Sequence, residues 1–546
     1  YTDLLMRMHA AHPKAGYDVT ALKVSEQARA RGLLELLAEA YTGIRQNVEM
    51  QLLERERTLK YRLTANLDKL TKLLSGKYTD SQKGAAESEI NTLTNEYRRV
   101  QMEIRERSPR YAALTEPQPL GVREIQQQLL DANTILLEYK LGDERSYLWA
   151  VTPDAVLSYQ LPPKAEIEAQ ARRVYQLLIA RQPARGLTEG QQRAREVAAD
   201  MEYRTEAIIL SKMLLAPVAA QLGTKRLLIV ADGALQYLPF AALPAPSTQA
   251  AEKDNDPRPL IIDHEIVSLP SASVLAVLRR ELAERKPAQK MVAVLADPVF
   301  DSGDARVKLS IASSKTPRST KNQQEQSAAT SLASSAVLKR ALRSVRGDDD
   351  NSASLRRLLF SRDEAEAILS ITPQQSGLKA LDFRANRALA MSDELSQYRI
   401  IHFSTHGVLD SRHPELSGLV LSLIDEAGQP QEGFLRLHEI YNLRLNADLV
   451  VLSACQTGLG KEVRGEGLIG LTRGFMYAGA PRVMASLWQV DDAATSELMK
   501  RFYRGVLQEK LPPATALRIA QLEMFRKRHW QSPYYWGAFV LQGEWR

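Results

Sequence analysis

The chain has 546 residues, of which 44% are hydrophobic and 25% charged, with a formal net charge of +7 and a pI of about 9.2. This length predicts two to four domains, and this composition supports sizeable cores. The basic residues are spread through predicted helices and one linker, without a compact basic patch interleaved with aromatics, so direct nucleic-acid binding is not expected. A single cysteine excludes an internal disulfide and favours a reducing compartment such as the cytoplasm.

The sequence contains no CxxC, HExxH or similar ligand spacing, so no metal and no other cofactor is expected. No run approaches the ~20 apolar residues of a membrane span, so no membrane contact is expected. The chain begins at Tyr1 in what is interpreted as a helix, which suggests a fragment and leaves open a signal peptide in the parent protein.

The first hundred residues are predicted to be helical. Residues 1–42 are rich in strong helix formers and carry an apolar stripe. Residues 43–110 carry leucines at helical spacing with a break near Gly76, which predicts a long antiparallel helical hairpin. This hairpin is either a strut or an arm that docks a partner, and the sequence does not choose between them.

A proline-containing boundary at residues 108–119 precedes a region of alternating strands and helices. The region 120–285 contains strand-like runs near residues 134, 146 and 226, with helical segments between them. Its only histidine is His264, and it contains no cysteine. We therefore interpret it as a non-catalytic α/β half.

The region 286–546 is predicted to be the catalytic half. It begins with a strand at residues 289–297, and an insertion at 302–353 follows that is rich in Ser, Ala, Lys and Arg and nearly lacks aromatics. This insertion is predicted to be disordered, either as a surface loop or as a pliable loop at the mouth of the site, and self-cleavage within it stays open. From residue 361 onward, alternating helices and strands predict a mostly parallel sheet covered by helices.

Two buried strands in this half end in residues that suit nucleophilic catalysis. Residues 449–452 form an apolar run that leads to Cys455, and residues 399–405 lead to His406-Gly407. The carboxyl ends of parallel strands are where open α/β sheets place ligands. The separation of 49 residues (455 − 406) matches the caspase spacing of about 50.

These residue types supply what a cysteine peptidase needs. The thiolate of Cys455 would be the nucleophile, and the imidazole of His406 would keep it deprotonated and later protonate the leaving amine. The backbone amides of Gly407 and Cys455 would form the oxyanion hole. A lone cysteine or histidine is more often structural, but the two together at strand ends favour catalysis.

The sequence resembles the CHAT family, caspase-like cysteine peptidases associated with TPR repeats and related to caspases, metacaspases and separase. The resemblance is carried by His402-Phe-Ser-Thr-His-Gly407, Leu452-Ser-Ala-Cys-Gln-Thr-Gly458 and residues 465–480, 483–492 and 533–541. It implies an α/β caspase-like fold, a catalytic dyad at His406 and Cys455, and TPR-like terminal helices at residues 1–42.

By this resemblance, the substrate pocket would be lined by Ser453 and by Trp488, Asp491 and Asp492. Metacaspases, which cut after Arg or Lys, carry an acid at the position of Ser453, so a basic preference is in doubt unless Asp491 or Asp492 restores the charge. Either aspartate can instead cap the helix predicted to start near residue 492.

Four other polar residues are considered for the same site. A basic pocket for cleavage after Asp would rest on Arg464 or Arg482, which are weak candidates. Asp410 is interpreted as a loop residue and His402 as a core histidine.

The sequence thus predicts a cytoplasmic, bacterial-type cysteine endopeptidase that cleaves a specific protein partner and is regulated through its helical front end. The alternative is a catalytically silent caspase-like scaffold. The substrate, the residue that precedes the cleaved bond, the activating signal and the oligomeric state are left open.

Overall fold

The computed structural model describes residues 1–41, scattered positions between 52 and 66, and residues 79–107, 120–184, 186–246, 258–313, 355–408, 417–453, 455–456, 466–489 and 491–546. The strands of the main sheet are β1 (Thr134–Lys140), β2 (Ser146–Val151), β3 (Val156–Leu161), β4 (Arg226–Val230), β5 (Ile266–Ser268), β6 (Lys290–Ala296), β7 (Gly377–Leu381), β8 (Tyr398–Ser404), β12 (Leu449–Leu452), β14 (Arg482–Ser486) and β15 (Phe539–Gly543). Their order across the sheet is β3-β2-β1-β4-β5-β15-β14-β12-β8-β6-β7.

The sheet is mostly parallel. Only the β1–β2, β2–β3 and β14–β15 pairs are antiparallel. The central strand β12 is buried along its whole length, as expected for an apolar, β-branched run in a parallel sheet covered on both faces. The α/β fold predicted from the alternation of strands and helices is therefore confirmed.

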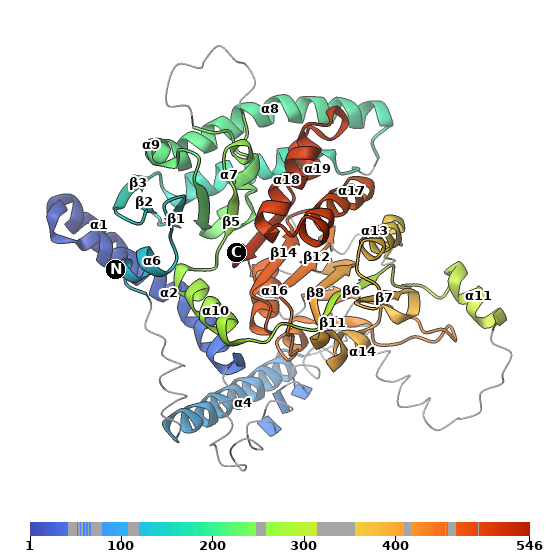
Figure 1. The fold of residues 1–546 in the computed structure, drawn as a ribbon. Coiled ribbons are helices and arrows are strands. Elements are labelled where there is room, and N and C mark those ends of the chain that lie inside the picture. Colours follow the sequence, from blue (N-terminus) through green and yellow to red (C-terminus); the bar gives the residue numbers. More distant parts are fainter. Residues whose placement is uncertain are drawn as a thin grey trace.

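Helices cover the sheet on both sides (Figure 1). In that view α13, α17 and α18 lie above β14, β12, β8 and β6, α16 lies beside β14 and β8, and α10 lies to the left of these strands, near α2. The helices of this α/β part are α6 (Val122–Gln128), α7 (Lys164–Leu178), α8 (Glu189–Leu215), α9 (Ala219–Leu222), α10 (Ala272–Glu284), α11 (Ala305–Ser313), α13 (Leu359–Ser370), α14 (Arg387–Ala390), α15 (Leu437–Ile440), α16 (Glu466–Tyr477), α17 (Asp492–Tyr503), α18 (Pro513–Phe525) and α19 (Pro533–Trp536).

One sheet runs through both predicted halves, and β15 lies at the seam. This strand makes an antiparallel ladder with β14 of the catalytic half, and Gln542 pairs with Ser268 in β5 of the other half. A single hydrophobic cluster extends across this seam, from the strands near residue 135 to Trp545. The two α/β halves therefore share one core.

A second, small sheet adjoins the main one. Its strands are β9 (His406–Val408), β10 (Gly418–Val420), β11 (Phe434–Arg436) and β13 (Cys455–Gln456), in the order β11-β10-β9-β13. Within it, β10 and β11 form an antiparallel pair.

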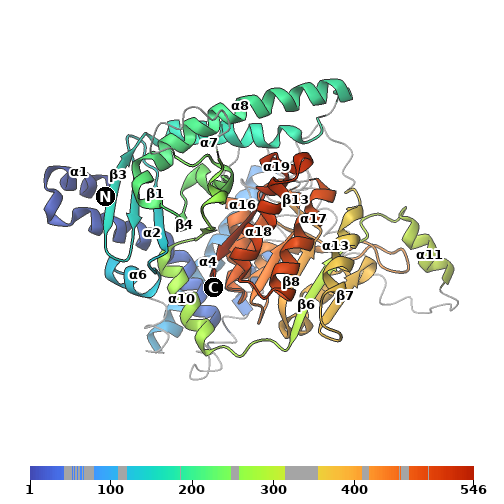
Figure 2. The same cartoon turned by 45° about the horizontal axis from the view of Figure 1, so that its top comes forward.

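The N-terminal helices are α1 (Thr2–Ala11), α2 (Tyr17–Tyr41) and α4 (Asp80–Arg107). α1 and α2 pack as a TPR-like pair, and α2 lies beside α10 in both ribbon views (Figure 2). Leu52 and Leu59 form a cluster with Leu93 and Val100 of α4. The helical hairpin stays a prediction, because most residues of its first helix lie outside the described residues.

Two expectations from the sequence need correction. Part of the predicted disordered insertion, residues 305–313, forms the helix α11, where Val307 packs with Val299 and Ile424. Residues 314–353 of that insertion lie outside the described residues.

The second correction concerns a helical stretch, Glu189–Leu222, which is long and apolar enough to cross a membrane by length and composition, although none was expected. Its apolar window is 39% buried inside the protein, and α8 packs against α7.

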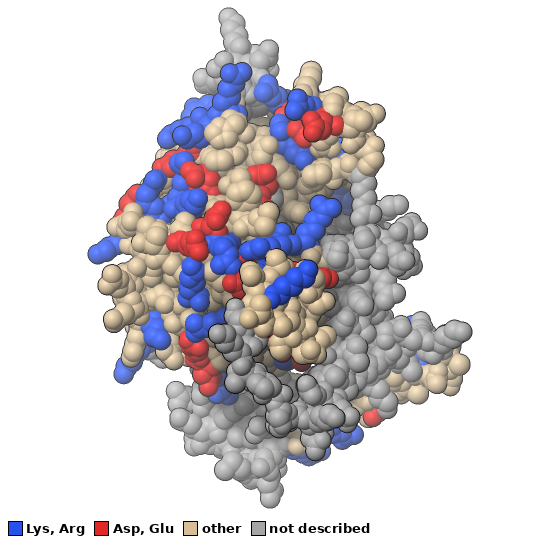
Figure 3. Space-filling model, turned by 90° about the vertical axis from the view of Figure 1, so that its right-hand side faces the viewer, with Lys and Arg blue, Asp and Glu red and all other residues tan. Residues whose placement is uncertain are grey.

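The face that carries α11 and α13 shows Lys and Arg interspersed with Asp and Glu rather than gathered by sign (Figure 3). This pattern gives no support for a nucleic-acid surface on this face.

Candidate active site

The strand β8 leads directly into His406. The chain bends at Thr405, whose hydroxyl donates to the carbonyl of Val420, and His406 then opens β9. In the small sheet the backbone of His406 pairs in register with that of Cys455, and Gly407 pairs with Gln456. The register therefore places the positions of the two candidate catalytic residues side by side, at the carboxyl ends of β8 and β12.

The imidazole of His406 is held in one orientation. Its Nε2 lies 2.6 Å from the carbonyl oxygen of Arg356, and its ring packs against Phe300 with the centroids 5.1 Å apart. A carbonyl can only accept, so Nε2 carries the proton of the neutral ring and Nδ1 is the basic nitrogen. The residue is only 4% exposed, which protects this arrangement from solvent.

A buried carboxylate joins the two strands that carry the candidate dyad. Glu364 of α13 accepts a hydrogen bond from the hydroxyl of Ser404 at 2.6 Å, two residues before His406. The same oxygen lies 3.4 Å from the hydroxyl of Ser453, two residues before Cys455. Because Glu364 is only 2% exposed, these hydroxyls supply part of the solvation that it loses.

His402 completes this buried network on the other side of Glu364. Its Nε2 lies 3.2 Å from Glu364 Oε1, and its Nδ1 lies 2.9 Å from the hydroxyl of Tyr503. Burial and the charge of Glu364 raise the pKa of Tyr503, so its hydroxyl stays a neutral donor. The interpretation of His402 as a core histidine is confirmed by its complete burial.

The two aspartates of the predicted substrate pocket take different positions. The side chain of Asp491 accepts from the backbone amide of Ala494 at 2.9 Å and so caps α17, the role left open by the sequence. Asp492 is half-buried at the first position of α17, and burial together with the charges of Asp491 and Glu364 raises its pKa. Asp492 therefore lies in the electrostatic field of the carboxylate that touches Ser453.

Trp488, the remaining predicted pocket residue, is 1% exposed. Its indole N–H donates to the carbonyl of Tyr534 at 3.0 Å, and its ring meets Tyr175 edge to face. Its side chain thus packs in the core shared by the two halves.

Of the three other sequence candidates, the structure describes only Arg482. Asp410 and Arg464 lie outside the described residues. Arg482 opens β14 and donates to the carbonyl of Asp448, which precedes β12. This is the amino end of the parallel strands, opposite His406, so Arg482 is not a pocket residue.

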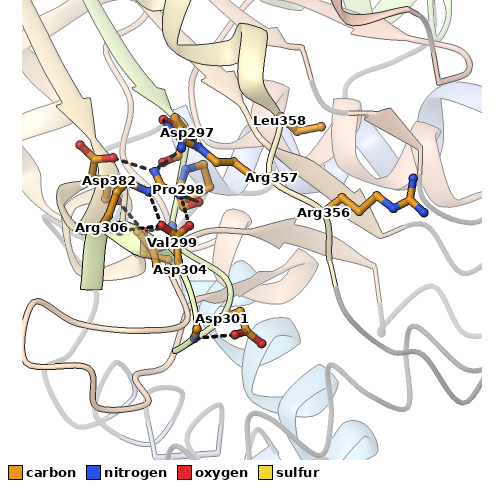
Figure 4. A network of polar contacts seen from close by, with 12 residues as sticks. Asp297, Pro298, Val299, Asp301, Asp304, Arg306, Arg356, Arg357, Leu358 and Asp382 are labelled. Carbon is orange, nitrogen blue, oxygen red and sulfur yellow. Dashed lines mark hydrogen bonds and ion pairs between the residues drawn. The ribbon is translucent and has the colours of Figure 1, made fainter. Parts of the chain in front are cut away.

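The loop before α13 is anchored by an ionic network (Figure 4). Asp297, which follows β6, is fully buried and accepts from both Arg357 and Arg362. Arg306 bridges Asp297 and Asp382. These contacts surround the segment whose Arg356 carbonyl meets His406.

The sequence analysis missed Glu364, Asp297 and the Arg356 carbonyl. A signal existed for Glu364, because Ser361, Glu364, Ala365 and Ile368 share the buried face of α13 at helical spacing. An acid on an apolar helix face indicates a buried polar contact. No sequence signal marks a backbone carbonyl.

One cavity lies away from the candidate site. A cavity of about 290 Å³ lies between α8 and α19, and its lining includes Arg181, Tyr203 and Trp536 but neither His406 nor Glu364. Within the described ranges, no group of three or more His, Cys, Asp or Glu side chains is arranged to hold a metal ion.

The mostly parallel sheet, the helices on both faces and the paired His406 and Cys455 positions define a caspase-like α/β domain. A family model of the CHAT domain matches residues 205–544, which is more than half of the chain. The chain therefore belongs to the CHAT-domain family, a caspase-like family that includes peptidases.

Two curated relatives are tetratricopeptide repeat protein 28 of Mus musculus, 34% identical over 113 residues, and that of Homo sapiens, 35% identical over 113 residues. Each match covers 21% of this chain and 4% of the relative. Saccharomyces cerevisiae separase, solved in complex with securin, aligns over 97% of this chain and 40% of that chain, with a TM-score of 0.46 and 10% identity. A second structure of that complex gives a TM-score of 0.45 and 9% identity.

Proposed function

We propose that this protein is a cysteine endopeptidase in which His406 and Cys455 form the catalytic dyad. The observation that carries the proposal is the in-register pairing of the two residues, together with the contact from His406 Nε2 to the Arg356 carbonyl. That contact makes Nδ1 the basic nitrogen of a histidine positioned beside the only cysteine.

In the proposed reaction, Nδ1 of His406 takes the proton of the Cys455 thiol, and the thiolate attacks the substrate carbonyl carbon. The backbone amides of Gly407 and Cys455 are the proposed donors to the resulting oxyanion. When the intermediate collapses, the C–N bond breaks and Nδ1–H protonates the leaving amine, which leaves a thioester on Cys455. A water molecule, deprotonated by Nδ1, then hydrolyses the thioester and restores the thiol.

We further propose that the residue preceding the cleaved bond is Lys or Arg. Glu364 brings negative charge to Ser453, and Asp492 lies within electrostatic range of Glu364. Among the described residues, no Lys or Arg side chain contacts either carboxylate. A substrate cation is the partner that would best compensate this charge. Thus the preference for Lys or Arg before the cleaved bond would come from Glu364 rather than from an acid at position 453.

The natural substrate would be a protein, and the TPR-like helices would recruit it or a regulator. Support comes from the packing of α2 on α10 and α16, because α16 is the first described helix after Cys455. The alternative, a catalytically silent scaffold, is favoured by the 4% exposure of His406.

Digestion of a diverse peptide library, read by mass spectrometry, separates these two functions. We expect cuts after Lys or Arg by the wild type, reduced about a thousandfold or more in both Cys455→Ala and His406→Ala. Equal cleavage by wild type and Cys455→Ala would reject the peptidase. If a thiol probe labels Cys455 independently of His406 and no peptide is cut, the scaffold is the better description.

A further inference from the structure

Residues 355–358, here named the return segment, immediately precede α13. The backbone carbonyl of Arg356 in this segment contacts the imidazole of His406. We propose that Arg357 is a positioning residue: its ion pair with Asp297 holds the Arg356 carbonyl in place, and that carbonyl fixes the tautomer of His406. The inference deepens the proposed function, on which it rests, because it concerns the same histidine.

The anchor is a two-pronged contact. Arg357 Nε lies 2.8 Å from Asp297 Oδ1, and Arg357 Nη2 lies 2.6 Å from Asp297 Oδ2. Such a fork fixes the direction of the guanidinium as well as its distance, which a single ammonium contact would not do. Asp297 is fully buried and Arg357 is 35% exposed, so water reaches the pair only from the side of the guanidinium.

Asp297 is itself held from other directions. Arg306 Nη1 lies 3.0 Å from its Oδ1, and Arg362 Nε lies 2.9 Å from its Oδ2. Arg306 also contacts Asp382 at 2.7 Å, which ties the cluster to the end of β7 (Figure 4). The carboxylate is therefore a fixed point at the carboxyl end of the sheet.

The anchor acts on His406 through one peptide plane. The carbonyl of Arg356 and the N–H of Arg357 belong to the same planar peptide unit, so holding Arg357 restricts the direction of that carbonyl. The side chain of Arg356 points away from the network in Figure 4, so only its backbone takes part. Without the anchor, Nε2 loses a fixed acceptor, and either ring nitrogen can carry the proton.

The test follows the reactivity of Cys455, because only the thiolate is alkylated and this thiol is the only one in the chain. The alkylation rate with iodoacetamide is measured from pH 5 to 9 for wild type, Arg357→Met, His406→Ala and Arg285→Met. We expect Arg357→Met to raise the apparent pKa of the thiol by about one unit, which slows alkylation near neutral pH about tenfold. The thermal melting temperature checks that each variant is folded.

Arg285→Met is the matched control. Arg285 also contacts a carboxylate, Asp448 at 2.9 Å, and donates to the carbonyls of Gly479 and Ala447. These contacts lie at the amino end of β12, opposite the candidate site, so the pH profile of alkylation should match the wild type.

A folded Arg357→Met variant with the wild-type profile overturns the inference while leaving the dyad intact. If His406→Ala also alkylates like the wild type, the dyad fails and the inference fails with it. If Arg357→Met does not fold, Arg357→Lys replaces it: lysine keeps the charge without the fork, so we expect an intermediate profile, and a wild-type profile would again overturn the inference.

Discussion

Asp492 is the residue on which the proposed substrate preference can be tested with least disturbance. It is half-buried, and its pKa is raised by burial and by the charges of Asp491 and Glu364. A substrate Lys or Arg bound near Ser453 would relieve that repulsion. We therefore expect the charge of Asp492 to affect cleavage of peptides with Lys or Arg before the cleaved bond, and not of peptides with a neutral residue there.

We expect Asp492→Asn to lower kcat/KM for peptides with Lys or Arg before the cleaved bond by about tenfold, equivalent to about 1.4 kcal/mol. Peptides with a neutral residue there should change little. Asp491→Asn is the control. Asparagine caps a helix as well as aspartate does, and the side chain of Asp491 is already engaged with the backbone amide of Ala494. A uniform loss across both peptide sets would place Asp492 outside the pocket.

Residue identity in the site could be predicted only in part. The positions of His406 and Cys455 could be predicted, because an apolar run of the kind that forms a buried strand precedes each of them in the sequence. In the structure, the two positions pair in register. The supporting groups could not be found in this way. Asp297 lies 60 residues from Arg357 in the chain, and the key contact of His406 is a backbone atom.

At the scale of elements, α2 is fastened to the α/β part by buried polar contacts. Ser25 donates to Glu138 of β1 at 2.7 Å, and Glu26 accepts from the backbone amides of Ala272 and Ser273 at 3.0 and 2.8 Å. Glu26 thus caps the amino end of α10 from another element. Burial, with the nearby Glu26, raises the pKa of Glu138 well above its usual value.

The raised pKa of Glu138 determines whether the stability of the fold rises or falls with pH. Between its ordinary value and its raised value, Glu138 binds a proton in the folded state but not in the unfolded state, so stability falls as the pH rises through that window. The slope from this one group is at most about 1.4 kcal/mol per pH unit. Glu138→Gln mimics the protonated form.

We expect urea denaturation of Glu138→Gln to show a flatter dependence of the unfolding free energy on pH from about 4.5 upward than the wild type. The exposed acid Glu144 offers a control, because Glu144→Gln should leave the slope as it is. Parallel curves for wild type and Glu138→Gln would mean that Glu138 is not the group that titrates.

Element boundaries could be predicted well where apolar runs are continuous. The strand expected at residues 289–297 is β6 (Lys290–Ala296), and the one expected at 134–139 is β1 (Thr134–Lys140). The helix α11 was not predicted, because the insertion as a whole has the composition of a disordered segment. Only nine of its residues form this helix, in which Val307 packs against the rest of the protein. Local propensity carries no information about such a partner.

At the scale of the whole molecule, the first α/β half (residues 120–285) is part of the scaffold of the second, which carries the candidate site. Tyr175 of α7 donates its hydroxyl to the carbonyl of Leu487 at 3.0 Å, and Gln182 donates to the carbonyl of Gln489. Both acceptors lie in the loop that leads to Asp491 and Asp492. The loop that leads to Asp492, the proposed pocket acid, therefore rests on the other half.

We expect residues 286–546, produced alone, to be less soluble and to melt at a lower temperature than residues 120–546. Removing the first half would leave β15 as an open sheet edge and expose the shared core near Trp488. Size-exclusion chromatography and thermal melting compare the two lengths. A monomeric, equally stable 286–546 fragment would show that the halves fold independently.

The position of β15 also sets an order of events during synthesis. This strand lies between β14 and β5, yet it is translated after every other strand of the sheet. Until residues 539–543 have been made, β5 and β14 each lack a neighbour, so the sheet is not continuous across the two halves. The strand that joins the two halves of the sheet is therefore the last strand of the sheet to be made.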